Sequence, residues 1–210
     1  MPARIQVDNG HPWGLNKGLP PDLALWLIGL GVGLNWIPPG QPQKNGTIER
    51  GNGLMQQWAE PATCRTRAEL EARLEREGRI QREHYPSVAG TSRMEAYPGL
   101  KHSGRPYDPA REDAMWDLSR VDQFLSGLLH HRRANARGAI WLYGRDRSLG
   151  RVHRGKEVCV RFDTDSREWK VSDHQGQELK RLVAEELSRE RILALKVGHR
   201  RPKSKRSERG

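Results

Sequence analysis

Cysteine is scarce in this chain of 210 residues, which contains only Cys64 and Cys159. Neither has a second cysteine near it, so the sequence offers neither the paired spacing of a zinc ribbon nor a disulfide framework. We therefore expect both thiols to be free and structural.

Long apolar runs are also missing. The best candidate, LALWLIGLGVGL at residues 23–34, is shorter than the roughly 20 residues of a membrane span and contains three glycines. The first residues, MPARIQVDNG, lack the apolar core of a signal peptide. We expect a soluble intracellular protein with no membrane partner.

Hydrophobic residues make up 35% of the chain, which is low for a compact enzyme and indicates extended or solvent-rich segments. Positive charge is plentiful but uneven. Residues 1–110 carry 13 Lys+Arg and 11 Asp+Glu, a net charge of +2, whereas residues 111–210 carry 24 and 15, a net charge of +9. This concentration favours a polyanionic partner, above all nucleic acid, over the alternative that the charge serves solubility alone.

The first half of the chain reads as mixed secondary structure. Short strands are predicted at 3–8 and 34–37, the first followed by the loop NGHPWGLNKGLPP. Asp22 is expected to cap a buried helix over 22–31. A second helix is predicted at 46–59, and a third begins at the capping box formed by Thr66 and Glu69. Residues 86–110 are expected to be irregular, and a fourth helix is predicted at 111–129.

After residue 138 the hydrophobic period changes from that of helices to that of strands. The expected strands are 139–144, 150–153, 157–163, 167–173 and 177–182, and five such strands predict a small antiparallel barrel. A last helix is expected at 184–195. The end, HRRPKSKRSERG, is basic and expected to be disordered.

Asp8 ends the first predicted strand, in the tripeptide DNG. A hairpin turn is one interpretation of DNG, but it requires an alternating strand directly afterwards, and HPWGLNKGLPP does not alternate. The carboxyl end of a strand is also a common position for a metal ligand or catalytic acid.

Glu49 lies in QKNGTIERGNG, residues 43–53. On a helix, Asn45, Glu49, Asn52 and Gln56 form one short, amide-rich stripe. Ile48, Met55 and Trp58 form a neighbouring apolar stripe that can pack on the sheet. Glycine weakens a helix interior by about 1 kcal/mol, so Gly51 and Gly53 make more sense where another backbone, such as that of DNA, approaches closely. Alone, Glu49 would still be an ordinary surface charge.

Together, the strand ending in DNG, the buried helix, the second strand and PPGQPQKNGTIERGNG resemble the second half of the catalytic core of retroviral-type integrases and bacterial insertion-sequence transposases. The resemblance is strong over residues 3–60 and looser beyond. It implies a partial RNase H-like α/β core with trailing helices at 1–130, a small SH3-like, DNA-binding β-barrel at 133–183, and a helix with a basic tail at 184–210.

The resemblance also implies a chemistry. Such proteins cleave and join DNA strands by phosphoryl transfer, with two Mg²⁺ (or Mn²⁺) ions held by an Asp, Asp, Glu triad. Asp8 and Glu49 match the second Asp and the Glu, and so become candidate catalytic residues and metal ligands. The DNA-binding candidates flank Glu49 or lie in the tail, and are Lys44, Asn45, Arg50, Arg200, Arg201, Lys203, Lys205 and Arg206.

Two departures from the pattern stand out. Forty residues separate Asp8 from Glu49, slightly more than the resemblance leads us to expect, which fits an enlarged loop. The first Asp of the triad has no counterpart, since only seven residues precede Asp8. The alternatives are a decayed gene, a misplaced start codon or one part of a split reading frame, and in each case little strand transfer is expected from this chain alone.

The partners implied are element ends and target DNA, with a homo-oligomer or a complementing N-terminal segment completing the site. The location implied is the bacterial cytoplasm, at the nucleoid. The rival interpretation is a non-enzymatic nucleic-acid-binding remnant or subunit that keeps the scaffold only.

Overall fold

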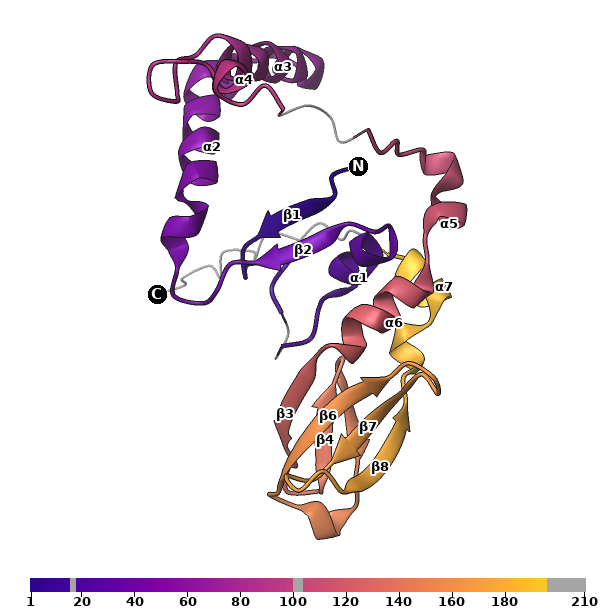
Figure 1. The fold of residues 1–210 in the computed structure, drawn as a ribbon. Coiled ribbons are helices and arrows are strands. Elements are labelled where there is room, and N and C mark those ends of the chain that lie inside the picture. The colour runs from indigo at the N-terminus through magenta and orange to yellow at the C-terminus, as the bar shows by residue number, and fades with distance from the viewer. Residues whose placement is uncertain (16–17, 100–103, 196–210) are drawn as a thin grey trace, which may run out of the picture. The chain divides into compact units, whose positions relative to one another are not determined.

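The computed structural model describes residues 1–15, 18–99 and 104–195, and shows a mixed α+β protein (Figure 1). Two compact units share the chain. Unit 1 comprises residues 1–14 and 32–109, and unit 2 comprises residues 15–31 and 110–210. The two units do not divide at residue 130, where the sequence predicts a domain boundary. Whether the parts on either side of residue 130 fold separately stays a prediction.

Unit 1 contains a two-stranded parallel sheet. Strand β1 (Arg4–Val7) pairs with β2 (Gly33–Trp36), with Arg4 opposite Gly33 and Val7 opposite Trp36. Both strands were predicted. The side chains of Val7 and Ile37 are buried, and each carboxyl end leads directly into a loop.

Two helices follow in unit 1, both at predicted positions. A 3₁₀ turn, η1 (Pro42–Asn45), leads into α2 (Gly46–Ala59), and α3 (Arg67–Glu83) follows after the 3₁₀ turn η2 (Pro61–Thr63). Thr66 caps α3 by accepting a hydrogen bond from the Glu69 backbone N–H, at 3.1 Å. The returning carboxylate of Glu69 accepts from Arg65 instead of Thr66, at 3.0 Å.

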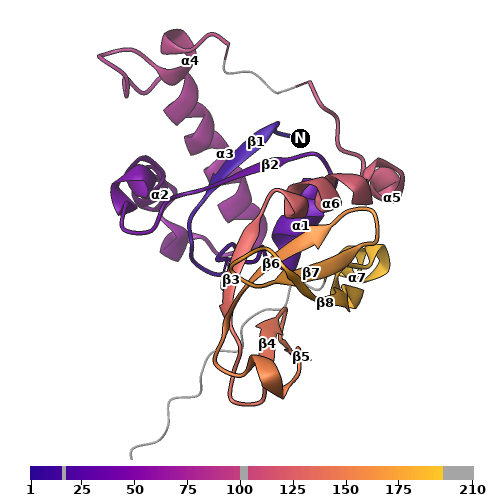
Figure 2. The ribbon, with the colours of Figure 1, turned by 60° about the horizontal axis from the view of Figure 1, so that its bottom comes forward.

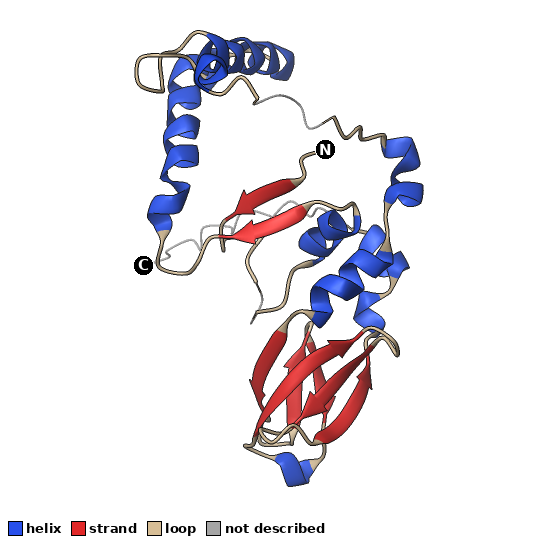
Figure 3. Cartoon of the chain, viewed as in Figure 1, coloured by secondary structure: helices blue, strands red, loops and turns tan. Residues whose placement is uncertain are grey.

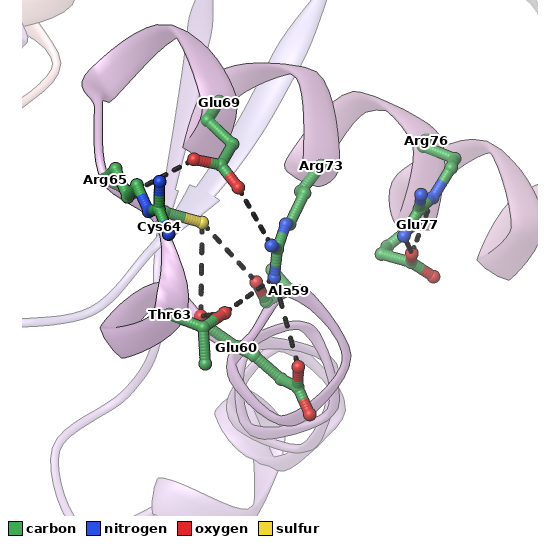
Figure 4. Close-up of polar contacts among 9 residues, drawn as sticks. All are labelled: Ala59, Glu60, Thr63, Cys64, Arg65, Glu69, Arg73, Arg76 and Glu77. Carbon is green, nitrogen blue, oxygen red and sulfur yellow. Dashed lines mark hydrogen bonds and ion pairs between the residues drawn. The ribbon is translucent and has the colours of Figure 1, made fainter.

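Arg73 holds the turn between α2 and α3 together (Figure 4). Its guanidinium donates to Glu69 Oε1 at 2.9 Å and to Thr63 Oγ1 at 2.7 Å, and it lies 3.9 Å from the Glu60 carboxylate. Glu60 itself has the left-handed backbone conformation (φ 44°) that ends α2.

In the apolar stripe of α2, Met55 and Trp58 pack on α3 and the segment after it, which corrects the expectation that the stripe packs on the sheet, and Ile48 is 47% exposed. The Trp58 ring meets Tyr85 edge-to-face, with centroids 5.0 Å apart, and Met55 lies beside Gly78. A sheet of two strands offers little apolar surface, whereas α3 presents its half-buried side to α2. A short helix, α4 (Arg93–Ala96), interrupts the predicted irregular stretch and begins with a full Ser92–Glu95 capping box.

Helices α1 (Asp22–Gly29), α6 (Leu118–Ser126) and α7 (Arg189–Leu193) belong to unit 2. Asp22 is not the N-cap of α1, because Pro21 occupies that position. The Asp22 carboxylate instead pairs with Arg191, at 3.1 Å.

The helix expected at 111–129 is broken in two. The 3₁₀ turn η3 (Pro109–Arg111) leads into α5 (Glu112–Met115), and Asp117 then caps α6. Between them Trp116 turns inward, 4% exposed, and its indole Nε1–H donates to the Trp26 carbonyl at 3.0 Å. A Cβ at Gly29 would lie 2.1 Å from that indole nitrogen, so glycine is required there.

The β region of unit 2 contains a four-stranded antiparallel sheet in the order β3-β6-β7-β8 and a separate hairpin (Figures 2 and 3). The sheet strands are β3 (Leu129–Arg133), β6 (Glu157–Asp163), β7 (Glu168–Ser172) and β8 (Glu178–Val183). The hairpin pairs β4 (Ala139–Leu142) with β5 (Arg145–Ser148). The last three sheet strands and β4 were predicted, whereas β3 and β5 were not.

Three predictions for this region are wrong. Hydrogen bonding between the strands of the described residues does not close the expected barrel. Residues 150–153 contain a 3₁₀ turn, η4 (Arg151–His153), because Gly150 adopts a positive φ that ends the extended backbone. The helix expected at 184–195 is a 3₁₀ turn, η5 (Glu185–Leu187), followed by α7, which Ser188 caps.

The core of unit 2 contains Trp169, which is fully buried and meets the Phe162 ring edge-to-face with centroids 5.3 Å apart; Val160 and Leu142 are also buried in this unit. The indole Nε1–H of Trp169 donates to the buried carboxylate of Glu186 at 2.9 Å, and Arg147 pairs with the other oxygen of that carboxylate. No helix among the residues described is long and apolar enough to cross a bilayer.

Candidate active site

Asp8 follows β1 at the point where the strand ends. Its Oδ1 accepts a hydrogen bond from the Gly10 backbone N–H at 3.0 Å, which closes a side-chain turn through DNG. Asn9 then donates from Nδ2 to the Ile37 carbonyl at 2.6 Å. This bond fixes the turn after β1 against the end of β2.

Glu49 lies in the first turn of α2, where the positive end of the helix dipole favours an anionic side chain. Asn45 Nδ2 donates to Glu49 Oε1 at 3.3 Å, as expected for neighbours one turn apart on one helical stripe. Gln6 in β1 donates from Nε2 to the Lys44 carbonyl at 3.1 Å. This second bond holds the start of α2 against the strand that ends at Asp8.

The two acids line the same pocket. We call it the acidic pocket: a hollow of about 330 Å³ lined by Asp8 and Asn9, by residues 37–41, and by Asn45 and Glu49. Both carboxylates are exposed to solvent. Asp8 and Glu49 are far apart in the sequence. The hydrogen bonds of Asn9 and Gln6 hold the chain segments that carry them beside the same pocket.

The acidic pocket offers two carboxylates as possible ligands of a hard divalent cation. Mg²⁺ prefers oxygen ligands and is often held by one or two carboxylates, with water and substrate phosphate completing its shell. Asp8 and Glu49 provide that pair. Within residues 1–15, 18–99 and 104–195, no group of three or more His, Cys, Asp or Glu side chains could hold a metal. Asp8 and Glu49 thus give the pocket two of the three acids that the resemblance leads us to expect.

The DNA-binding candidates are separated by the structure. Lys44 and Arg50 are exposed on either side of Asn45 and Glu49, but Arg50 lines a different hollow from the acidic pocket. Arg200, Arg201, Lys203, Lys205 and Arg206 lie outside the described residues.

Four further candidates were not predicted from the sequence, because Gln81 and Tyr85 belong to a predicted helix that reads as a charged, solvated face and the other two lie in the irregular stretch 86–110. Gln81, Tyr85, Arg93 and Tyr97 line a second hollow with Arg50. The Ser92–Glu95 capping box was a signal that could have placed Arg93 and Tyr97 on an ordered element.

Many arginines of unit 2 pair with carboxylates of the same unit. Arginine–carboxylate pairs join distant segments, among them Arg145–Glu185, Arg167–Asp122 and Arg189–Asp113. Arg151, Arg154 and Lys156, which we call the η4 cluster, are exposed and form no ion pair among the described residues. The η4 cluster is thus a part of unit 2 that can meet an external anion.

A scan of this chain against protein-family models finds no match.

Proposed function

We propose that this chain is a DNA-processing protein of the transposase and integrase type. In this proposal β1, β2 and α2 are part of an RNase H-like core, and Asp8 and Glu49 are ligands of Mg²⁺ or Mn²⁺. The observation that carries the proposal is the acidic pocket, which brings an acid at a strand end together with an acid in the first turn of a helix.

The residues around the pocket suit a phosphodiester. A bound divalent ion would supply neutralisation of phosphate charge and activation of water. Lys44 and Arg50 are exposed and flank Glu49 in the sequence, and we propose that they contact phosphates next to the one in the pocket. Because two carboxylates suit one ion, we propose that metal and DNA binding belong to this chain, and that strand transfer requires a third acidic ligand.

Unit 2 has a different role in the proposal. Its β region is proposed to be an SH3-like DNA-binding module that contacts phosphates through the η4 cluster. This contact is independent of sequence and would hold the chain on DNA while the acidic pocket meets one phosphate.

The test is DNA binding measured with and without Ca²⁺, which binds carboxylates like Mg²⁺ but is not expected to support cleavage. Ca²⁺ should raise the affinity of the wild-type protein, and Glu49→Gln should remove that increase while keeping the metal-free affinity. Glu71→Gln, an exposed acid on α3, is the matched control. An equal increase in all three proteins would refute the metal site.

A second candidate function is nucleic-acid binding without catalysis. It is favoured by the absence of a group of three metal-ligating side chains among the described residues. The same experiment separates the two, since a pure binding protein would show no Ca²⁺ increment. Conversely, metal-dependent nicking of supercoiled DNA by this chain, abolished by Glu49→Gln, would show that the pair of acids suffices.

A further inference from the structure

A larger hollow lies in unit 1, on a different side of α2 from the acidic pocket. We call it the tyrosine groove. Its volume is about 1090 Å³, and it is lined by α2, by the end of α3, and by the segment leading into α4. Figure 1 shows these three helices gathered together. The volume is slightly above the usual range of about 300–1,000 Å³ for ligand-binding sites.

The charge of the tyrosine groove is positive. Arg50 on α2 and Arg93 on α4 line it, and none of the described residues that line it is acidic. Arg93 donates from Nε to Ser87 Oγ at 3.3 Å, which orients its guanidinium without neutralising it. Guanidinium groups bind phosphate oxygens through paired hydrogen bonds, so a phosphate is the anion that fits.

Two aromatic rings are exposed in the same groove. Tyr85 is 39% exposed and Tyr97 is 54% exposed. Trp58 contacts the Tyr85 ring edge-to-face, at an interplanar angle of 78°, which fixes the orientation of that ring. Exposed aromatic faces beside arginines are the arrangement on which unpaired bases stack.

A buried amide points to a missing hydrogen-bond acceptor. Gln81 lines the groove and is 6% exposed, yet its Nε2 has no hydrogen-bond partner among the described residues. A buried donor without a partner destabilises a fold, so such a group is expected where a ligand supplies the acceptor.

The wall on α2 allows a second backbone to come close. Gly51 and Gly53 both line the groove, and a Cβ added at either would meet nothing within 4 Å. Arg50, which lines the groove, directly follows Glu49, which lines the acidic pocket, so a strand with one phosphate in the acidic pocket can pass around α2 to reach the groove.

We propose that the tyrosine groove binds an unpaired segment of DNA. Arg50 and Arg93 bind its phosphates, Tyr85 and Tyr97 stack on its bases, and Gln81 donates to a base or phosphate oxygen. A duplex fits less well, because paired and stacked bases hide the faces that the tyrosines would contact. The inference rests on the proposed function for the choice of DNA as the polymer, but strand binding itself requires no metal.

The test is fluorescence anisotropy of the full chain, in EDTA, with a labelled single strand of mixed sequence and with its duplex. Tyr97→Ala should weaken single-strand binding by about tenfold and leave duplex binding unchanged, whereas Tyr97→Phe, which keeps the ring, should bind as the wild type does. Arg93→Ala should weaken the single strand more than Arg67→Ala, an exposed arginine outside the groove.

Gln81→Met gives an independent readout. Replacing the unpartnered amide by an apolar side chain of similar size should raise the melting temperature while lowering single-strand affinity. A raised melting temperature with unchanged affinity would mean that Gln81 does not meet the strand.

Three results would overturn the inference: equal affinity of Tyr97→Ala and wild type for the single strand, an equal loss of duplex binding in that variant, or displacement of the strand by an equal concentration of an acidic phosphopeptide. Because EDTA excludes metal from every arm, these results leave metal binding at Asp8 and Glu49 untouched. Failure of the Ca²⁺ experiment would in turn leave the tyrosine groove intact.

Discussion

Glu186 shows how one residue can hold several segments of unit 2 together. It is 3% exposed, and its carboxylate accepts from Trp169 Nε1 and pairs with Arg147. Removing one member of a buried ion pair leaves the other charge unpaired in a poorly solvated place.

Glu186→Ala is therefore expected to lower the free energy of unfolding by about 3 kcal/mol or more. Its neighbour Glu185 provides the control, since its side chain is 65% exposed where it pairs with Arg145. Glu185→Ala should cost less than about 1 kcal/mol. Urea denaturation of the full chain measures both, and equal effects would contradict this role for Glu186.

His130 predicts how stability depends on pH. Burial lowers the pKa of His130 to about 4 from 6.5, and Arg132 and His131 add to the effect. The unfolded chain therefore takes up a proton below pH 6.5 that the folded protein refuses. Stability from this group is complete above pH 6.5 and is lost as pH falls toward 4.

The expected loss between pH 7 and pH 4.5 is roughly 2 kcal/mol. His130→Leu removes the titrating group and should flatten that part of the pH profile, measured by urea denaturation. His174→Leu, at an exposed turn position, should keep the wild-type slope. A steep profile in His130→Leu would show that other groups cause the pH dependence.

Among the elements, α2 contains two interior glycines, Gly51 and Gly53, which make the helix less stable than alanine would. Gly51→Ala and Gly53→Ala should each raise the free energy of unfolding by about 0.5–1 kcal/mol, because alanine favours the helix and the added Cβ meets open space. Thermal denaturation checks this. Gly29→Ala makes the opposite prediction, since its Cβ would collide with the Trp116 indole.

Helices and strands with regular hydrophobic spacing were predictable, and those without it were not. β3 reads LHHRR and β5 reads RDRS, so neither shows the alternation that marks a strand. Pairing with β6 and β4 forms them instead. The break between α5 and α6 depends on the hydrogen bond from the Trp116 indole to the Trp26 carbonyl. This is a tertiary contact, which the local sequence does not encode.

The candidate site was likewise predictable only in part. Asp8 and Glu49 could be singled out from DNG and from the helix that follows the prolines. Their meeting in one pocket depends on Asn9 and Gln6 bonding to distant backbone carbonyls. The tyrosine groove was not predictable, because its residues come from three helices with no shared motif.

At the scale of the whole molecule, net charge and available charge differ. The second half of the chain has a net charge of +9, yet many of its arginines pair with acids of the same unit. The binding of DNA phosphates to unit 2 should therefore depend strongly on the η4 cluster.

The double variant Arg151→Gln/Arg154→Gln tests this dependence. It should reduce the slope of log affinity for duplex DNA against log salt by about 2, since each phosphate contact contributes about 0.9. Arg65→Gln/Arg67→Gln removes the same charge from exposed positions of unit 1 and should change the slope less. Equal slopes in both variants would indicate that DNA binding depends on positive charge spread over the surface and not on a local contact at the η4 cluster.

The proposed function requires above all that Asp8 and Glu49 together bind a divalent metal ion. Titration of the full chain with Mn²⁺, followed by the loss of the free-ion electron paramagnetic resonance signal, tests it directly. We predict one site in the wild type that is lost in both Asp8→Asn and Glu49→Gln and kept in Glu71→Gln. No Mn²⁺ binding by the wild type, or equal binding by all four proteins, would contradict the account.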